Sequence, residues 1–181
     1  MEPTYSALKA LLVQNLARLY YAENQLVRAL KMMAEKATRP ELREAFLSHR
    51  AETKTQVERL ATTFVELQEP VQAHYCQAID GLLQNGNWLM HTLERGSVLD
   101  SALIGAAQQV ELFEVASYRN VCGLAMQLEL ARVAQVCEGI LYEELEADDK
   151  LSAIAEGLGM GSGVSLAVQE EEEQEERKAE N

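Results

Sequence analysis

Apolar residues recur at alternating spacings of three and four along most of the chain, a pattern that predicts long amphipathic helices. Four such helices are expected, over residues 4–36, 40–68, 98–125 and 129–156. Thr38 and Glu41 have the spacing of a capping box, and Pro40 falls in the first turn of the second helix. The first two helices should therefore form a tight antiparallel hairpin.

The connection between the second and third long helices, residues 69–97, carries one shorter amphipathic pattern over residues 71–84. We expect Asn85-Gly86-Asn87 to end this short helix, and Ser97 or Asp100 to cap the long helix that follows. A connection of this length can return the chain along the whole bundle, as in ferritin-like folds. The predicted fold is all-α: a ferritin-like four-helix bundle of two antiparallel hairpins, whose long crossover carries a short extra helix.

Composition changes after residue 156 and divides the chain into a bundle and a tail. Residues 1–156 hold all the amphipathic patterns and are predicted to form one helical domain. In residues 157–181, closely spaced glycines are followed by a run of glutamates, a composition typical of disordered segments. In the whole chain, 48% of residues are hydrophobic and only 10 are Gly and 3 are Pro, which favours helices over a β-sandwich or barrel.

Charge and cysteine content restrict the expected partners and location. The formal net charge of -13 should repel nucleic acids and anionic membrane surfaces, so neither is an expected partner. No apolar stretch is long enough to span a bilayer. The 3 cysteines have no CxxC spacing, which fits a reducing compartment better than a disulfide framework. We therefore expect a cytoplasmic protein.

Polar side chains interrupt each of the four apolar stripes near its middle. The first helix has one such position, the second has three in the region of its centre, and the third and fourth have two each. The interrupting residues are Glu23, then His49, Glu52 and Gln56, then Glu111 and Glu114, and finally Glu144 and Asp148. No Lys or Arg occupies a stripe position among them.

The positions of the two predicted hairpin turns place these side chains at one height in the bundle. Glu23 and Glu52 are equally far from the turn at Thr38, and Glu111 and Glu144 are equally far from the turn near residue 128. Residues equidistant from the turn of an antiparallel hairpin lie side by side. Six carboxylates should therefore share one layer of the core, those of Glu23, Glu52, Glu111, Glu114, Glu144 and Asp148.

A layer of ionised carboxylates needs positive charge, because each uncompensated buried charge costs several kcal/mol. Two iron or manganese ions would supply it, as in bundles with a Glu from each of two helices and a Glu-x-x-His pair from each of the other two. The six carboxylates are the predicted ligands. His49 and Gln56 are further candidates, either as ligands or as hydrogen-bond partners of ligands. Tyr20, Tyr118 and Tyr142 lie near the layer and are expected chiefly to fill the core.

Four segments resemble the YciE/YciF-like stress-response family of ferritin-like proteins. They are Tyr21–Leu26, His49–Leu60, Ala107–Tyr118, and Glu143-Glu144 with Asp148. The resemblance covers residues 5–156 and implies a rubrerythrin-like bundle, a homodimer and a di-metal centre. Carried onto the matching positions, it implies the same six carboxylates as ligands. Leu112-Phe113 and Arg119-Asn120 depart from the His-Tyr and Gly-Thr pairs that the family usually has there.

The leading functional hypothesis is a di-iron or di-manganese protein that reacts with peroxide or oxygen in a stress response. Because the chain lacks a rubredoxin-type CxxC module, its electrons would come from an unidentified donor. Two alternatives stay open. One is iron sequestration with a ferroxidase centre, which requires a hollow multimer. The other is a non-enzymatic stress or interaction protein with protonated acids, so the sequence leaves open whether the chain is an enzyme.

Overall fold

The computed structural model describes residues 3–159, which form five α-helices and no strand. The helices are α1 (Pro3–Lys36), α2 (Pro40–Glu66), α3 (Gln77–Thr92), α4 (Ser97–Gln127) and α5 (Ala131–Glu156). The predicted all-α fold is confirmed, and the four long helices end within a few residues of their predicted bounds. Most of the predicted tail, from residue 160 onward, lies outside the described residues.

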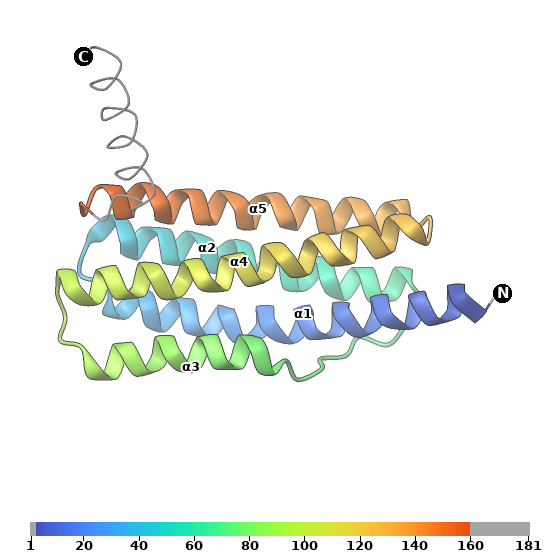
Figure 1. The fold of residues 1–181 in the computed structure, drawn as a ribbon, viewed down its shortest axis with the longest axis horizontal. Coiled ribbons are helices and arrows are strands. Elements are labelled where there is room, and N and C mark those ends of the chain that lie inside the picture. Colours follow the sequence, from blue (N-terminus) through green and yellow to red (C-terminus); the bar gives the residue numbers. More distant parts are fainter. Residues whose placement is uncertain (1–2, 160–181) are drawn as a thin grey trace, which may run out of the picture.

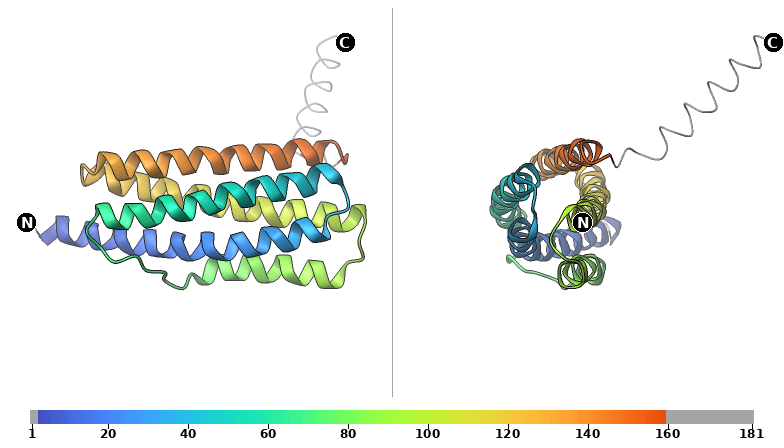
Figure 2. Two further views of the ribbon diagram at one scale, coloured as in Figure 1. Left: turned by 180° about the vertical axis from the view of Figure 1, so that it is seen from behind. Right: turned by 90° about the vertical axis from the view of Figure 1, so that its left-hand side faces the viewer.

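Helices α1, α2, α5 and α4 surround one axis, and α3 lies outside this ring (Figure 1 and the end view in Figure 2). Each helix of the ring contacts its two neighbours, and α3 contacts α4 and α1. The crossover returns along the bundle from the end of α2 to the start of α4, and the His74 N–H donates to the Ala17 carbonyl at 2.9 Å. This is the predicted ferritin-like arrangement. Within residues 3–159, no helix combines the length and the apolar character needed to cross a bilayer.

The short helix of the crossover lies later in the chain than predicted. It begins at Gln77 and runs through Asn85-Gly86-Asn87 to Thr92, so the predicted range of 71–84 is wrong. Gly86 is buried, and a Cβ there would lie 4.0 Å from the Cβ of Ala106 on α4. Ile79 and Met90 are buried on the same helix. Packing against α4 therefore outweighs the local preference of Asn-Gly-Asn for a turn.

The N-terminus of α2 is capped by a residue of another helix, so the predicted capping box is wrong. Thr38 donates its N–H to Asp100 Oδ1 at 2.8 Å and its hydroxyl to Oδ2, and the Arg39 N–H donates to Oδ2 at 3.0 Å. Asp100 lies in the first turn of α4 and is fully buried. Its carboxylate caps the N-terminus of α2 and not that of α4. Asp100 thereby joins the two hairpins at one end of the bundle.

The apolar core consists of two clusters. One contains Leu16, Phe64 and Ile140, and the other contains Phe46 and Leu103. Buried polar side chains lie between them, and we call these residues the polar layer: Glu23, His49, Gln56, Glu111, Glu114 and Glu144. The predicted interruption of the core stripes is therefore real, and all four helices of the ring contribute to it.

Candidate metal centre

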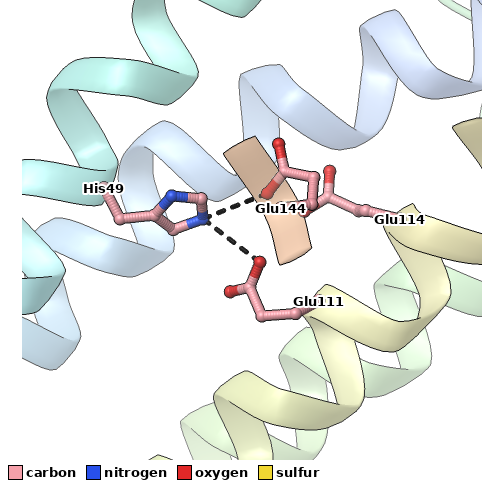
Figure 3. Close-up of side chains that lie close together, drawn as sticks. All are labelled: His49, Glu111, Glu114 and Glu144. Atoms are coloured by element: carbon pink, nitrogen blue, oxygen red, sulfur yellow. Dashed lines mark ion pairs between the residues drawn. The ribbon is translucent and has the colours of Figure 1, made fainter. Parts of the chain in front are cut away.

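Four side chains of the polar layer converge on one point in the bundle (Figure 3). His49 comes from α2, Glu111 and Glu114 from α4, and Glu144 from α5. Each offers one ligand atom, and these four atoms all lie within 4.8 Å of one another. His49 Nε2 lies 3.4 Å from Glu111 Oε2 and 3.6 Å from Glu144 Oε2. All four residues are buried.

Helix periodicity explains why Glu111 and Glu114 can act together. Residues three apart lie on the same face of a helix, and in α4 this face points inward. Both residues are only 1% exposed, although α4 also has exposed positions such as Leu112. Exposure of Leu112 agrees with its place outside the core stripe of α4. Two carboxylates on one helix face therefore reach the same point.

Glu23 approaches the cluster from α1. It is fully buried, and its Oε1 accepts a hydrogen bond from the Tyr118 hydroxyl, whereas its Oε2 has no hydrogen-bond partner. The charge of Glu23 also raises the pKa values of Glu114 and Glu144, although burial is the larger cause for both. Glu23 therefore belongs electrostatically to the same site, and Tyr118 fixes one of its oxygens.

Glu52 and Asp148 lie at the edge of the layer. The Glu52 side chain is 34% exposed, with Oε2 at 3.6 Å from His49 Nδ1 and Oε1 at 3.8 Å from Lys150 Nζ. Thr53 is fully buried, so Thr53 holds the core position that the sequence pattern gave to Glu52. Asp148 is partly buried, and its Oδ1 is a buried atom without a hydrogen-bond partner. The structure brings neither carboxylate into the four-residue cluster, and their predicted role as ligands stays a prediction.

Gln56 connects the cluster to a polar network that the sequence pattern did not reveal. Its Nε2 donates to Glu144 Oε1 at 2.5 Å and to Glu143 Oε2 at 3.0 Å. Glu143 in turn pairs with Arg59 through its Oε2. Two weak features of the sequence point to this network: Arg59 follows Gln56 by three positions, and Glu143 directly precedes Glu144. Gln56 therefore fits the role of a hydrogen-bond partner that orients a ligand.

The three tyrosines near the layer have different environments. Tyr20 packs edge-on against Phe64, with ring centroids 6.1 Å apart, and Tyr118 is fully buried, so both fill the core as predicted. Tyr142 is 66% exposed, so the predicted core position of Tyr142 is wrong. Its ring lies on the outer face of α5, one position before Glu143 and two before the inward-facing Glu144.

Burial changes the protonation of the layer. It raises the pKa of Glu23 from an ordinary 4.5 to about 7, against the opposing effects of the Tyr118 hydroxyl and His49. Burial also raises the pKa values of Glu114 and Glu144 well above the ordinary value. The pKa of His49 is lowered by burial, but nearby Glu111 and other carboxylates outweigh this and raise it overall. Without a cation, the layer therefore retains protons at neutral pH.

Unpartnered atoms show that the site suits a cation. In the described part of the chain, buried atoms without a hydrogen-bond partner are concentrated here: Glu23 Oε2, both ring nitrogens of His49, Gln56 Oε1, Glu111 Oε2, Glu114 Oε1, Glu144 Oε2 and Asp148 Oδ1. Buried polar atoms in folded proteins are normally paired. Carboxylate oxygens with one imidazole are donors that iron and manganese accept. No Lys or Arg is buried within residues 4–159, and the donors of the cluster could hold a metal ion.

Comparisons with known proteins agree with the fold and with the predicted family. The family model described as "Domain of unknown function (DUF892)" matches residues 7–161. Protein YciF of Escherichia coli K12 is 37% identical over 137 residues, which covers 75% of this chain and 82% of YciF.

Solved structures also match. The E. coli stress protein YciF has a TM-score of 0.81 at 33% identity, covering 86% of this chain and 98% of YciF. YcfI from Rhodopseudomonas palustris has a TM-score of 0.76 at 34% identity, covering 80% and 92% of the two chains. A Xanthomonas campestris protein with a TM-score of 0.65 and 22% identity, covering 92% of this chain and 99% of its own, supports the fold alone. The matched segment covers all five helices except the first four residues of α1, and the chain therefore belongs to the DUF892 family, as its resemblance to YciF-like proteins predicted.

Proposed function

We propose that the chain is a di-metal carboxylate protein that binds two iron or manganese ions in the polar layer and reacts with peroxide or oxygen during stress. The observation that carries this proposal is the buried cluster of His49, Glu111, Glu114 and Glu144 with its unpartnered ligand atoms. When ionised, these three carboxylates and Glu23 carry four negative charges. Two divalent ions would balance that charge and leave His49 neutral, the form that binds metals.

The residues of the layer have distinct roles in this proposal. His49, Glu111, Glu114, Glu144 and Glu23 would hold the ions. The Tyr118 hydroxyl holds one oxygen of Glu23, and the Gln56 amide holds one oxygen of Glu144. Hydrogen bonds of this kind fix the orientation of a ligand and raise metal affinity. The remaining oxygen of each carboxylate has no hydrogen-bond partner and is free to bind an ion.

When bound in this layer, two iron or manganese ions would supply one electron each, and two electrons with two protons would reduce one hydrogen peroxide to two water molecules. In this proposal the two apolar clusters, which lie on either side of the layer along the bundle, would limit competing reactions. The description of E. coli YciF as a stress protein supports a role in stress for this chain. The homodimer, the external electron donor and the cytoplasmic location expected from the sequence remain proposals.

Metal loading of the purified chain tests this function. Chelator-treated protein is incubated without oxygen with Fe²⁺ or Mn²⁺, freed of excess metal and subjected to elemental analysis. We expect about two ions per chain, and consumption of about one hydrogen peroxide for each pair of ions. A Glu114→Gln/Glu144→Gln variant should lose most of both.

Glu146→Gln is the matched control, because Glu146 is an exposed acid of the same helix as Glu144. It should bind metal and consume peroxide as the parent does. Equal metal content in the double variant and the parent would place the ions elsewhere. Metal uptake without any peroxide or oxygen consumption would limit the proposal to metal binding.

A further inference from the structure

A narrow cavity connects the polar layer to the surface between α2 and α5. Its volume is about 20 Å³, enough for one water-sized molecule. The side chains that line it include Phe46, His49, Glu52, Glu111, Ala147 and Lys150. Four larger grooves in the described part of the chain are lined by other residues, and none of the four includes a member of the polar layer.

The two ends of this cavity differ in chemistry. At the inner end, both ring nitrogens of His49 and Glu111 Oε2 are buried and have no hydrogen-bond partner. At the outer end, the side chains of Glu52 and Lys150 are 34% and 52% exposed. A small apolar residue, Ala147, forms part of the wall between the two ends. The inner end therefore offers ligands for a cation, and the outer end is open to solvent.

Glu52 contacts both ends of the cavity. Its Oε2 lies 3.6 Å from His49 Nδ1, and its Oε1 lies 3.8 Å from Lys150 Nζ. The Glu52 side chain therefore lies between the buried ring of His49 and the exposed ammonium group of Lys150. A negatively charged group that reaches from solvent to a buried histidine is well placed to receive a cation.

We propose that this cavity is the entrance for the divalent ion and that Glu52 receives the ion at the surface and passes it to His49 and Glu111. The inference rests on the proposed function, because it presupposes that the layer binds metal. Lys150 occupies the cation position beside Glu52 until the ion displaces it. Ion pairs as exposed as this one are weak, so the lysine can leave easily. Glu52 is thus a transit site in the entrance and not a resident ligand.

Stopped-flow uptake of Co²⁺ by the metal-free full-length chain tests the proposal, because the absorption of Co²⁺ reports binding without any peroxide reaction. Glu52→Gln removes the receiving charge and keeps the side-chain shape. Ala147→Leu adds three carbon atoms to the wall of this narrow cavity and should obstruct it. Both variants should bind as many ions as the parent at equilibrium, but take them up about tenfold more slowly. Lys150→Met should take them up about threefold faster.

Glu58→Gln and Lys54→Met are the matched controls, because both residues are exposed on α2 and neither lines the cavity. Their uptake rates should equal that of the parent. Parent rates in both Glu52→Gln and Ala147→Leu would overturn the proposed entrance. A lower number of bound ions in Glu52→Gln would show a resident ligand and overturn the transit role. Thermal melting establishes that Ala147→Leu is folded, and Glu52→Gln tests the route independently of it. A parent that binds no Co²⁺ would refute the metal site itself, a result distinct from the others.

Discussion

The substitution Glu23→Gln tests whether the charge of the polar layer destabilises the fold when no cation is bound. Glu23 is fully buried, and burial raises its pKa from 4.5 to about 7 in the folded chain without metal. Glutamine has almost the same shape and can still accept the hydrogen bond of Tyr118. It does not ionise, so the substitution removes a charge and little else.

The expected loss of stability follows from the pKa values of Glu23 in the unfolded and in the folded chain. In the unfolded chain Glu23 loses its proton near pH 4.5, and in the folded chain only near pH 7. The folded state binds more protons between these values, so its stability falls as pH rises through this window. Each unit of difference is worth about 1.4 kcal/mol, which gives about 3 kcal/mol in total. Most of this loss, about 2 to 3 kcal/mol, falls between pH 5 and pH 8.

Urea unfolding of chelator-treated protein, followed by helical circular dichroism at pH 5 and pH 8, measures this difference. Between pH 5 and pH 8, the parent should lose about 2 to 3 kcal/mol more unfolding free energy than Glu23→Gln. Glu146→Gln is the control and should follow the parent, because Glu146 is exposed. Excess Mn²⁺ should stabilise the parent more than Glu23→Gln, because the variant has lost a ligand. Identical pH dependence of the metal-free parent and Glu23→Gln would refute the reasoning, since it would mean that the charge of Glu23 is already compensated.

Three further predictions concern metal affinity, stability and pH. Tyr118→Phe should weaken metal binding about tenfold in a chelator competition, because one oxygen of Glu23 loses its donor; unchanged affinity would contradict this. Asp100→Asn should lower the unfolding free energy by about 2 kcal/mol without changing metal content, because it weakens the cap of α2; an unchanged melting temperature would refute the cap. Metal binding should release about three protons, since Glu114, Glu144 and His49 all have raised pKa values and bind metal in their deprotonated forms, and affinity should fall as pH falls. Calorimetry in two buffers measures this release, and a binding enthalpy independent of the buffer would argue against it.

The sequence predicted the long helices well because their apolar periodicity is a local property of the chain. It misplaced α3 because the deciding contact is not local: Gly86 lies against Ala106 on another helix. It also assigned Thr38 a capping role that Asp100 performs from another helix. Each of these errors involves residues that are distant in the sequence and adjacent in the fold.

The polar layer could be found from sequence because an acid in an apolar stripe is conspicuous. Glu23, Glu111, Glu114 and Glu144 are buried as that pattern indicated. The pattern was wrong by one residue on α2, because a stripe with spacings of three and four can pass through Thr53 as readily as through Glu52.

The link from Gln56 through Glu143 to Arg59 depends on side-chain contacts between α2 and α5. Helix periodicity carries no information about such contacts. Ligation of an ion, the metal identity and the homodimer are likewise properties that periodicity cannot decide, and they remain predictions.

The most direct test for ions in the polar layer is an anomalous difference map, recorded at the manganese absorption edge from crystals of Mn²⁺-loaded protein. We predict two peaks among Glu23, His49, Glu111, Glu114 and Glu144, with the unpartnered oxygens of these residues turned toward them. A map without peaks in the layer, in which the same carboxylates bind water or each other through shared protons, would contradict the proposed metal centre.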